Sequence, residues 1–284
     1  MKFSSRSRVV PGSLMYRLYR LIALLVVLFL SACATRPEAQ SSKSKSDTSV
    51  PLFSTNSAGG LPVGWAPLII LRNKKPTEYA LVKDGAKTVL HAHADSSSSA
   101  LMHEMNVDPA ALPWLTWEWK ISCLLKKADN TQRTTEDSPV RIILGFDGDK
   151  ESLPFADQVL FDTAKLVTGY DFPYATLMYI WENKAPVGTV IRSPHSGRIR
   201  MLVAASGADG IGEWRLFMRN VVEDFEKAFG EKPGRLIGIG VLTDTDNTGD
   251  KVEAWYGDIR LLRERAGTVN ASRSGNGLSL QARF

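Results

Sequence analysis

The amino-acid sequence predicts a mostly β protein, built as a single jelly-roll-like antiparallel β-sandwich with one amphipathic helix at about residues 214–229. One reason is the segment TWEWKI (116–121), in which polar and apolar residues alternate with the period of a half-buried strand. A second reason is that strand-like apolar segments recur along the chain, namely VRIILGF, ATLMYIW, GRIRMLVAAS and RLIGIGVL. The third is length, because about 210 residues lie between two polar ends and one large sandwich accommodates them.

The N-terminal segment, residues 1–32, has the features of a lipoprotein signal peptide. Basic residues precede an apolar run from Leu21 to Ala32, which is shorter than the about 20 apolar residues of a transmembrane helix. The run ends in LSAC, which resembles the bacterial lipobox, and this resemblance implies cleavage before Cys33 and lipidation of Cys33. Ala34 follows the cysteine, which by resemblance to Gram-negative sorting rules implies lipid anchoring in the outer membrane, on its periplasmic face. The alternative is an uncleaved signal anchor with an incidental cysteine.

Composition divides the remaining chain into three parts. Residues 33–50 are polar and rich in Ser and Lys, which predicts a flexible tether. Residues 51–264 form the predicted sandwich domain, and residues 265–284 a polar C-terminal tail. The chain has 35 basic and 30 acidic residues, and five of the basic ones precede Cys33, so 30 of each remain after cleavage. This balance gives no basic surface of the kind that nucleic-acid binding requires.

Two further elements follow from local signals. The segments EYALV and KTVLHAHAD are joined by KDGA, whose Asp84-Gly85 pair predicts a tight hairpin turn. In residues 214–229 the apolar residues recur at helical spacing, so we expect a helix whose aromatic stripe packs on the sheets and which ends at Gly230. Cys123 has no partner if Cys33 carries lipid, and its apolar context predicts a buried, inert thiol.

Several of these segments together resemble one bacterial family. LTWEWKI, VRIILGF, YIW, RNVVEDFEKAFGEKP, TDTDNTG and AWYGDI are similar to the domain of unknown function family 3047, over most of residues 60–262. The resemblance implies an envelope protein of β-sandwich type and brings no established catalytic residue. The segment WYGDIRL is also similar to the last strand of jelly-roll carbohydrate-binding modules, in which an acidic residue lies near a structural calcium ion.

The segment TDTDNTGD (243–250) concentrates acidic residues in one short loop. It begins like a calcium-binding D-x-D-x-T-G loop, but Trp255 stands where an EF-hand requires a bidentate Glu, and strands flank it. Three interpretations stay open: a calcium site with Asp244, Asp246 and Asp258 as ligands, a hairpin turn shaped by Asx side chains, or direct contact with a ligand.

Residues near this loop are the candidates for ligand contact. Tyr256 and Asp258 alternate with Trp255, so they are expected to share one face of a strand, and we predict Tyr256 and Asp250 as ligand-binding residues. His91 and His93 share a face with Asp95, a spacing that can hold zinc. A zinc site needs a third protein ligand that the sequence does not supply, so a solvated strand face is the favoured interpretation.

No motif for a catalytic nucleophile or a phosphate-binding loop is present in the sequence, so we favour a non-enzyme. The expected function is non-catalytic binding of a glycan or another polar envelope ligand, with calcium as a possible cofactor. The first alternative is an envelope polysaccharide hydrolase, which would use a pair of carboxylates across a sugar. The second is a structural or assembly lipoprotein that binds a protein partner.

The signal peptide makes one testable prediction. Cys33→Ser should abolish lipidation, because the lipobox cysteine is the acyl acceptor. Metabolic labelling with a palmitate analogue should mark the wild-type chain and leave the Cys33→Ser chain unlabelled. Persistent labelling of the variant would contradict the assignment.

Overall fold

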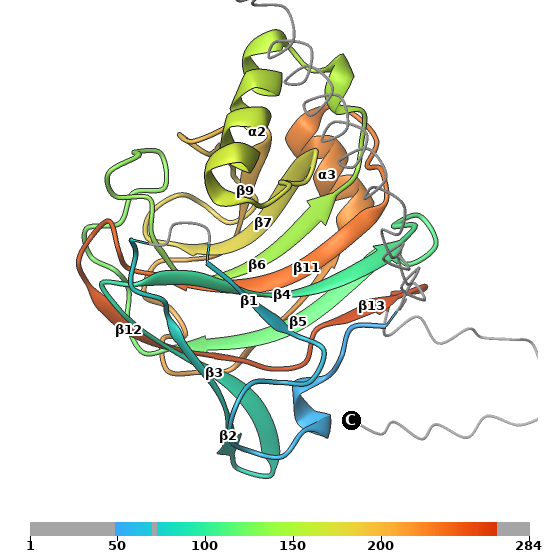
Figure 1. The fold of residues 1–284 in the computed structure, drawn as a ribbon. Helices are drawn as coiled ribbons and strands as arrows, with labels where there is room; N and C mark the ends of the chain where they lie inside the picture. The colour runs from blue at the N-terminus through green and yellow to red at the C-terminus, as the bar shows by residue number, and fades with distance from the viewer. Residues whose placement is uncertain (1–48, 70–72, 266–284) are drawn as a thin grey trace, which may run out of the picture. The chain divides into compact units, whose positions relative to one another are not determined.

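The computed structural model describes residues 49–69 and 73–265, which form two packed β-sheets (Figure 1). The first sheet has seven strands in the order β1 (Ala66–Leu68), β4 (Ser98–Val107), β11 (Leu236–Asp244), β6 (Ser138–Phe146), β7 (Ala175–Glu182), β9 (Ile199–Ser206) and β8 (Val190–Arg192). The second has six, in the order β10 (Arg215–Asn220), β5 (Trp114–Ile121), β12 (Lys251–Tyr256), β3 (Lys87–Asp95) and β2 (Glu78–Asp84), with β13 (Arg260–Leu262) also paired to β5. The predicted mostly β sandwich is therefore confirmed.

Strand pairing is antiparallel with one departure. Among the named strands described, β7 and β9 pair in parallel, and all the other pairs are antiparallel. The hairpin between β2 and β3 turns at Gly85, whose φ of 59° lies in the left-handed region that glycine adopts without strain. This agrees with the turn predicted from Asp84-Gly85.

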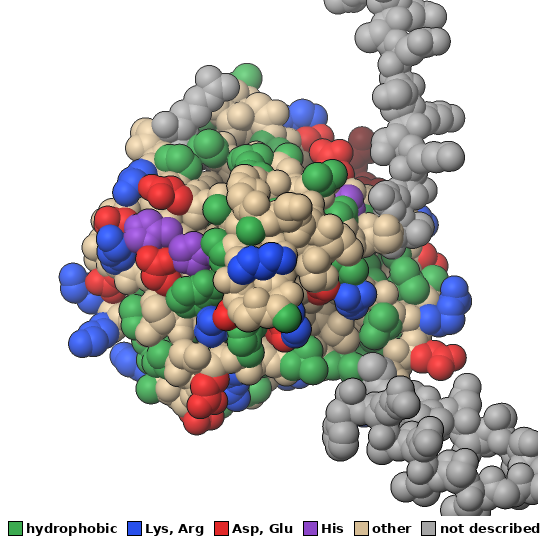
Figure 2. All heavy atoms as spheres, turned by 90° about the horizontal axis from the view of Figure 1, so that it is seen from below, with side chains coloured by type: hydrophobic (Ala, Val, Ile, Leu, Met, Phe, Trp, Pro, Cys, Tyr) green, Lys and Arg blue, Asp and Glu red, His purple; other side chains and the backbone are tan. Residues whose placement is uncertain are grey.

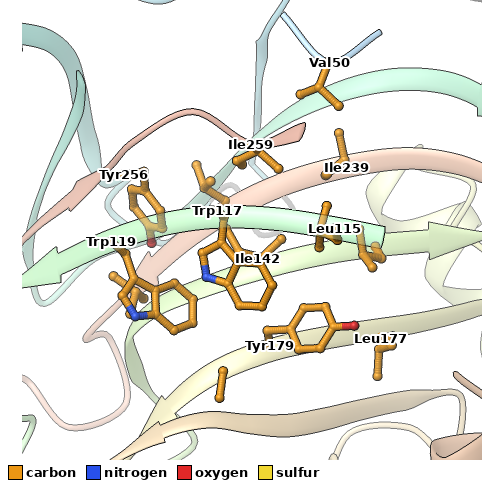
Figure 3. Close-up of a cluster of buried hydrophobic side chains, with 14 of the residues drawn as sticks. Val50, Leu115, Trp117, Trp119, Ile142, Leu177, Tyr179, Ile239, Tyr256 and Ile259 are labelled. Carbon is orange, nitrogen blue, oxygen red and sulfur yellow. The ribbon is translucent and has the colours of Figure 1, made fainter. Parts of the chain in front are cut away.

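The alternation of β5 places an aromatic cluster between the two sheets. Trp117 and Trp119 are both fully buried, as the sequence predicts. The ring of Trp117 stacks on that of Tyr179 from β7 with centroids 4.8 Å apart, and Figure 3 shows both tryptophans between the two sheets. Phe217 of β10 stacks on the other side of Trp117 at 5.1 Å. Burial of such large rings dominates the apolar contribution to the stability of the core.

The predicted helix over residues 214–229 is wrong in its first half. Residues 215–220 form β10, which pairs with β5 along its whole length, and the helix α3 spans Val221–Phe229 only. Asn220 ends the strand and begins the helix, because its side-chain oxygen accepts hydrogen bonds from the backbone N–H groups of Val222 and Glu223. The α3 helix contacts both β9 and β10 and so closes one side of the sandwich. It ends at Gly230, as predicted.

A second helix, α2 (Phe155–Thr168), was not predicted, and two short 3-10 helices, η1 (Phe53–Thr55) and η2 (Lys150–Ser152), accompany the sheets. None of the residues of α2 is buried. Phe155 is 80% exposed, Leu166 86% and Val167 74%, so the helix presents apolar side chains to solvent. Within the described residues, no helix is long and apolar enough to cross a membrane.

One sequence prediction is wrong, and others fall on residues that the structure does not describe. Cys123 is exposed rather than buried, because it lies two residues beyond Ile121, the last residue of β5, and its thiol donates a hydrogen bond to the carbonyl of Lys251 at 3.7 Å. The predicted signal peptide, the predicted lipidation site Cys33 and most of the predicted tether and tail lie outside the described residues, so these expectations stay predictions.

Candidate functional site

The acidic loop between β11 and β12 brings together three carboxylates. Donor atoms of Asp137, Asp244 and Asp246 lie within 4.8 Å of one another. Two of the three predicted calcium ligands are therefore neighbours, but the third is not. Asp258 instead accepts hydrogen bonds from the backbone and hydroxyl of Ser54, at 3.0 and 2.6 Å, which fixes it against η1. The prediction of Asp258 as a ligand of this group is wrong, and Asp137, which sequence reasoning did not select, occupies its place.

Asp137 shapes the loop from a distant part of the chain. Its carboxylate is fully buried and accepts hydrogen bonds from the backbone N–H and the hydroxyl of Thr248, both at 2.7 Å, and from the side-chain amide of Asn247 at 3.1 Å. Asp246 forms an ion pair with Lys74 at 2.6 Å. Protein groups therefore bind the carboxylates of both Asp137 and Asp246. This is the arrangement expected of a hairpin turn that Asx side chains stabilise.

A buried arginine completes the network. Arg141 on β6 is 1% exposed, and its guanidinium contacts Asp244 with two nitrogens at 3.2 Å and Glu136 with a third at 3.1 Å. Glu136 also lies 3.0 Å from His195. Burial opposes ionisation of Glu136, but the hydrogen bond from His195 and the charge of Arg141 outweigh it and lower the pKa of Glu136.

Two carboxylates, Asp244 and Glu136, therefore contact one buried guanidinium, and the charge of Asp137 also acts on this group. Burial raises the pKa of Asp244 to about 7, against the opposing charge of Arg141, and the negative charges of Asp137 and Glu136 add to the rise. Near pH 7, Asp244 is therefore protonated in only part of the molecules. Such buried, hydrogen-bonded ions are costly to disrupt, since removal of one partner leaves an uncompensated charge.

Of the two predicted ligand-contact residues, only Asp250 reaches the surface. Tyr256 is fully buried, its hydroxyl lies 2.7 Å from that of Thr243, and it donates to the carbonyl of Leu242 at 2.8 Å. The prediction that Tyr256 faces a ligand is wrong, because Tyr256 rather than Trp255 points between the sheets. Asp250 is half-buried, and its Oδ2 has no hydrogen-bond partner among the described residues.

The outer face of the six-stranded sheet carries a different group of residues, which we call the aromatic row: Trp214, Lys120, Trp255 and His91. The ammonium of Lys120 lies 5.1 Å from the ring centroid of Trp214 and 4.6 Å from that of Trp255. The ring of His91 lies 5.2 Å from that of Trp255 on the other side. The row therefore crosses β5, β12 and β3, with Trp214 immediately before β10. All four side chains are partly exposed.

Asp84 holds one end of this row in place. Its carboxylate binds Lys120 at 2.7 Å and accepts a hydrogen bond from the indole N–H of Trp214 at 2.8 Å. These two hydrogen bonds lower the pKa of Asp84. Sequence reasoning missed the row because its residues come from four separate segments. The alternation of β5 was the available signal, since it places Lys120 on the face opposite the buried tryptophans.

The same face carries the two histidines considered as zinc ligands. His91 and His93 both contact the carboxylate of Glu253 on β12, and the Nδ1 of His93 lies 2.6 Å from it. Asp95, which shares their face, is paired with Lys251 instead. Figure 2, which views the molecule from the side of this sheet, shows histidine side chains beside acidic ones.

An open pocket of about 550 Å³ lies at the edge strand β8 of the other sheet. Two acids, Asp129 and Glu182, line it. Both are engaged in local turns: Glu182 accepts hydrogen bonds from the backbone of Lys184 and Ala185, and Asp129 from the backbone and hydroxyl of Thr131.

The raised pKa of Asp244 makes a prediction for stability. The folded chain keeps a proton on Asp244 that the unfolded chain, with an ordinary value of 3.8, releases. This contribution to the free energy of unfolding is therefore full below about pH 4 and is lost as pH rises through about 7, with a slope of at most about 1.4 kcal/mol per pH unit. Asp244→Asn, which does not titrate, should lack it.

Urea unfolding of wild type and Asp244→Asn between pH 4.5 and 8 measures this term. The stability advantage of wild type over the variant should shrink as pH rises. Asp209→Asn, whose side chain is 93% exposed, is the control and should keep a constant difference from wild type. A pH-independent difference for Asp244→Asn would show that Asp244 is ionised throughout.

Comparison with known proteins identifies the family to which this chain is similar. A comparison with curated proteins found no match. A family model described as a protein of unknown function, DUF3047, matches residues 63–260, which is more than half of the chain. The matched range includes the acidic loop, the Arg141 network and the aromatic row. The chain therefore belongs to the DUF3047 family.

Proposed function

We propose that this chain is an outer-membrane-anchored binding lipoprotein whose ligand is a glycan or another polar envelope molecule. The observation that supports the proposal is the aromatic row on the outer face of the six-stranded sheet. Trp255 and Trp214 supply flat apolar surfaces of the kind on which sugar rings stack. Lys120 and Asp84 lie beside them and supply a donor and an acceptor for hydroxyl groups.

The row is also prearranged, which favours binding. Asp84 fixes both Lys120 and Trp214, and His91 limits the movement of Trp255. Side chains that are already held in place lose little conformational entropy when a ligand binds. The lipid anchor at Cys33 would hold this surface near the membrane, within reach of envelope polymers.

The acids of the β8 pocket and of the acidic loop favour binding over hydrolysis. A glycosidase needs one carboxyl group free to donate a proton and a second free to attack or to activate water. In the pocket at β8, both acids accept hydrogen bonds from neighbouring backbone groups and hold turns. In the acidic loop, Asp244 pairs with a buried arginine. Calcium in that loop stays a prediction, with Asp137, Asp244 and Asp246 as the carboxylates that could bind it.

A glycan array probed with the purified chain tests the proposal. Trp255→Ala should weaken binding to any recognised glycan by ten-fold to a hundred-fold, the usual cost of losing an aromatic anchor. Trp114→Ala is the matched control, because Trp114 is also half-exposed and lies on the same face of β5, six residues from Lys120. Arms with EGTA and with calcium determine whether the acidic loop contributes. Equal loss in both variants, or no recognised glycan, would overturn the proposal.

A protein partner is a second candidate, and one observation favours it. The helix α2 presents Phe155, Leu166 and Val167 to solvent without burying any residue. Exposed apolar patches on soluble domains often mark interaction surfaces. This surface belongs to the other sheet's side of the molecule in Figure 1, away from the strands of the aromatic row.

Site-specific photo-crosslinking in cells tests the second candidate. A photoreactive residue in place of Leu166 should give a discrete crosslinked protein band, because the apolar helix would be covered. The same residue in place of Val187, which is 61% exposed on a loop, should not. If both positions or neither give the band, α2 is not a specific docking surface.

A further inference from the structure

We propose that His91, His93 and Glu253 form a binding site for a divalent transition-metal ion of the Zn²⁺ class. The two histidines lie two residues apart on β3, so they point to the same outer face of the six-stranded sheet. Glu253 lies on the neighbouring strand β12, directly opposite His93 in the register. This site does not depend on glycan binding by the aromatic row, and it supplies the third protein ligand that the sequence alone does not reveal.

The side chains already converge. The Nδ1 of His93 lies 2.6 Å from one oxygen of Glu253, and the Nε2 of His91 contacts the other oxygen. One carboxylate thus lies between two imidazole nitrogens that both face it. Two imidazoles and one carboxylate are the protein ligands of many catalytic zinc sites, in which water occupies the fourth position.

In the metal-free chain, each imidazole can donate one N–H to this carboxylate. To bind zinc, the nitrogen of each imidazole that faces Glu253 must present its lone pair, since imidazole binds a metal in its neutral form. The proton on that nitrogen then moves to the other ring nitrogen, or is released to solvent if the ring was doubly protonated. The three donor atoms do not all lie within 4.8 Å of one another, as those of the acidic loop do. Loading therefore requires rotation of the side chains, and the three groups have room for it because they are 24%, 24% and 36% exposed.

The surroundings suit a cation that prefers nitrogen ligands. Glu78 on β2 lies opposite His93 on its other side, so a second carboxylate is close to the site. The acidic loop suits such a cation less well. Arg141 already pairs with Asp244 and Lys74 with Asp246, and the metal-binding atoms of the loop would all be hard oxygens. Imidazole donors favour zinc, copper and nickel over calcium or magnesium.

A competition titration with Zn²⁺ against a chromophoric chelator tests the site. The purified chain carries Cys123→Ser, because that exposed thiol could itself bind zinc. In this background one equivalent of zinc should bind, and His91→Ala, His93→Ala and Glu253→Gln should each weaken binding at least ten-fold. His195→Ala is the matched control, since this exposed histidine lies on another surface and should have no effect. If an alanine variant melts early, His91→Gln or His93→Gln replaces it.

Fluorescence gives an independent readout. Because the ring of His91 lies 5.2 Å from that of Trp255, Cu²⁺ bound at His91 should quench Trp255. Quenching should saturate at one equivalent, be reversed by excess Zn²⁺, and disappear in Trp255→Phe and in His91→Ala. Equal zinc affinity in wild type and in the His91→Ala and His93→Ala variants would overturn the proposal. So would loss of affinity in His195→Ala alone. Loss of glycan binding in Trp255→Phe with zinc affinity unchanged would separate this site from the proposed function.

Discussion

The alternation of side chains along β5 is the constraint on which the rest of the structure depends. Trp117 and Trp119 point between the sheets and meet Tyr179 and Phe217, which fixes the register of β5 against β10 and its packing on the facing sheet. The same period of two sends Lys120 outward. A one-residue slip would bury Lys120 and expose the tryptophans at once. The alternation of β5 therefore contributes side chains to both the core and the candidate ligand surface.

The buried arginine has a different role, since it joins loops rather than sheets. Arg141 extends from the central strand β6 and binds Asp244 at the end of β11, while Glu136 connects the same network to His195. Asp137, next in sequence to Glu136, holds the acidic loop closed. Apart from the contact between Arg141 and Glu136, these links join distant parts of the chain: Arg141 and Asp244 are 103 residues apart, and Asp137 and Thr248 are 111. A buried polar network therefore ties together this end of the sandwich.

The strands were predictable from sequence because their signal is local. Period-two alternation and apolar runs identified β5, β6, β7, β9 and β11, and Asp84-Gly85 identified the β2–β3 hairpin. The helix was predicted too long, since residues 215–220 have helical spacing but pair with β5, where Phe217 gains burial against the tryptophans. Tertiary packing therefore favoured a strand over a helix for these residues. The α2 helix escaped prediction because it buries nothing and so has no core-facing stripe to detect.

Candidate sites were harder to predict, because proximity in sequence gave the wrong partners. The acidic loop attracted attention by its local density of Asp residues. Its charges are matched by Arg141 and Lys74, whose positions in sequence carry no such signal. The outer sheet face shows the reverse case. His91 and His93 lack a third ligand in sequence, and Glu253, 160 residues from His93, supplies it only when β12 pairs with β3. Buried acids with protein partners stabilise a loop, whereas half-exposed donors that converge across strands can exchange protons for a metal or a ligand. Exposure, rather than the number of acids, therefore separates the functional candidates from the structural ones in this fold.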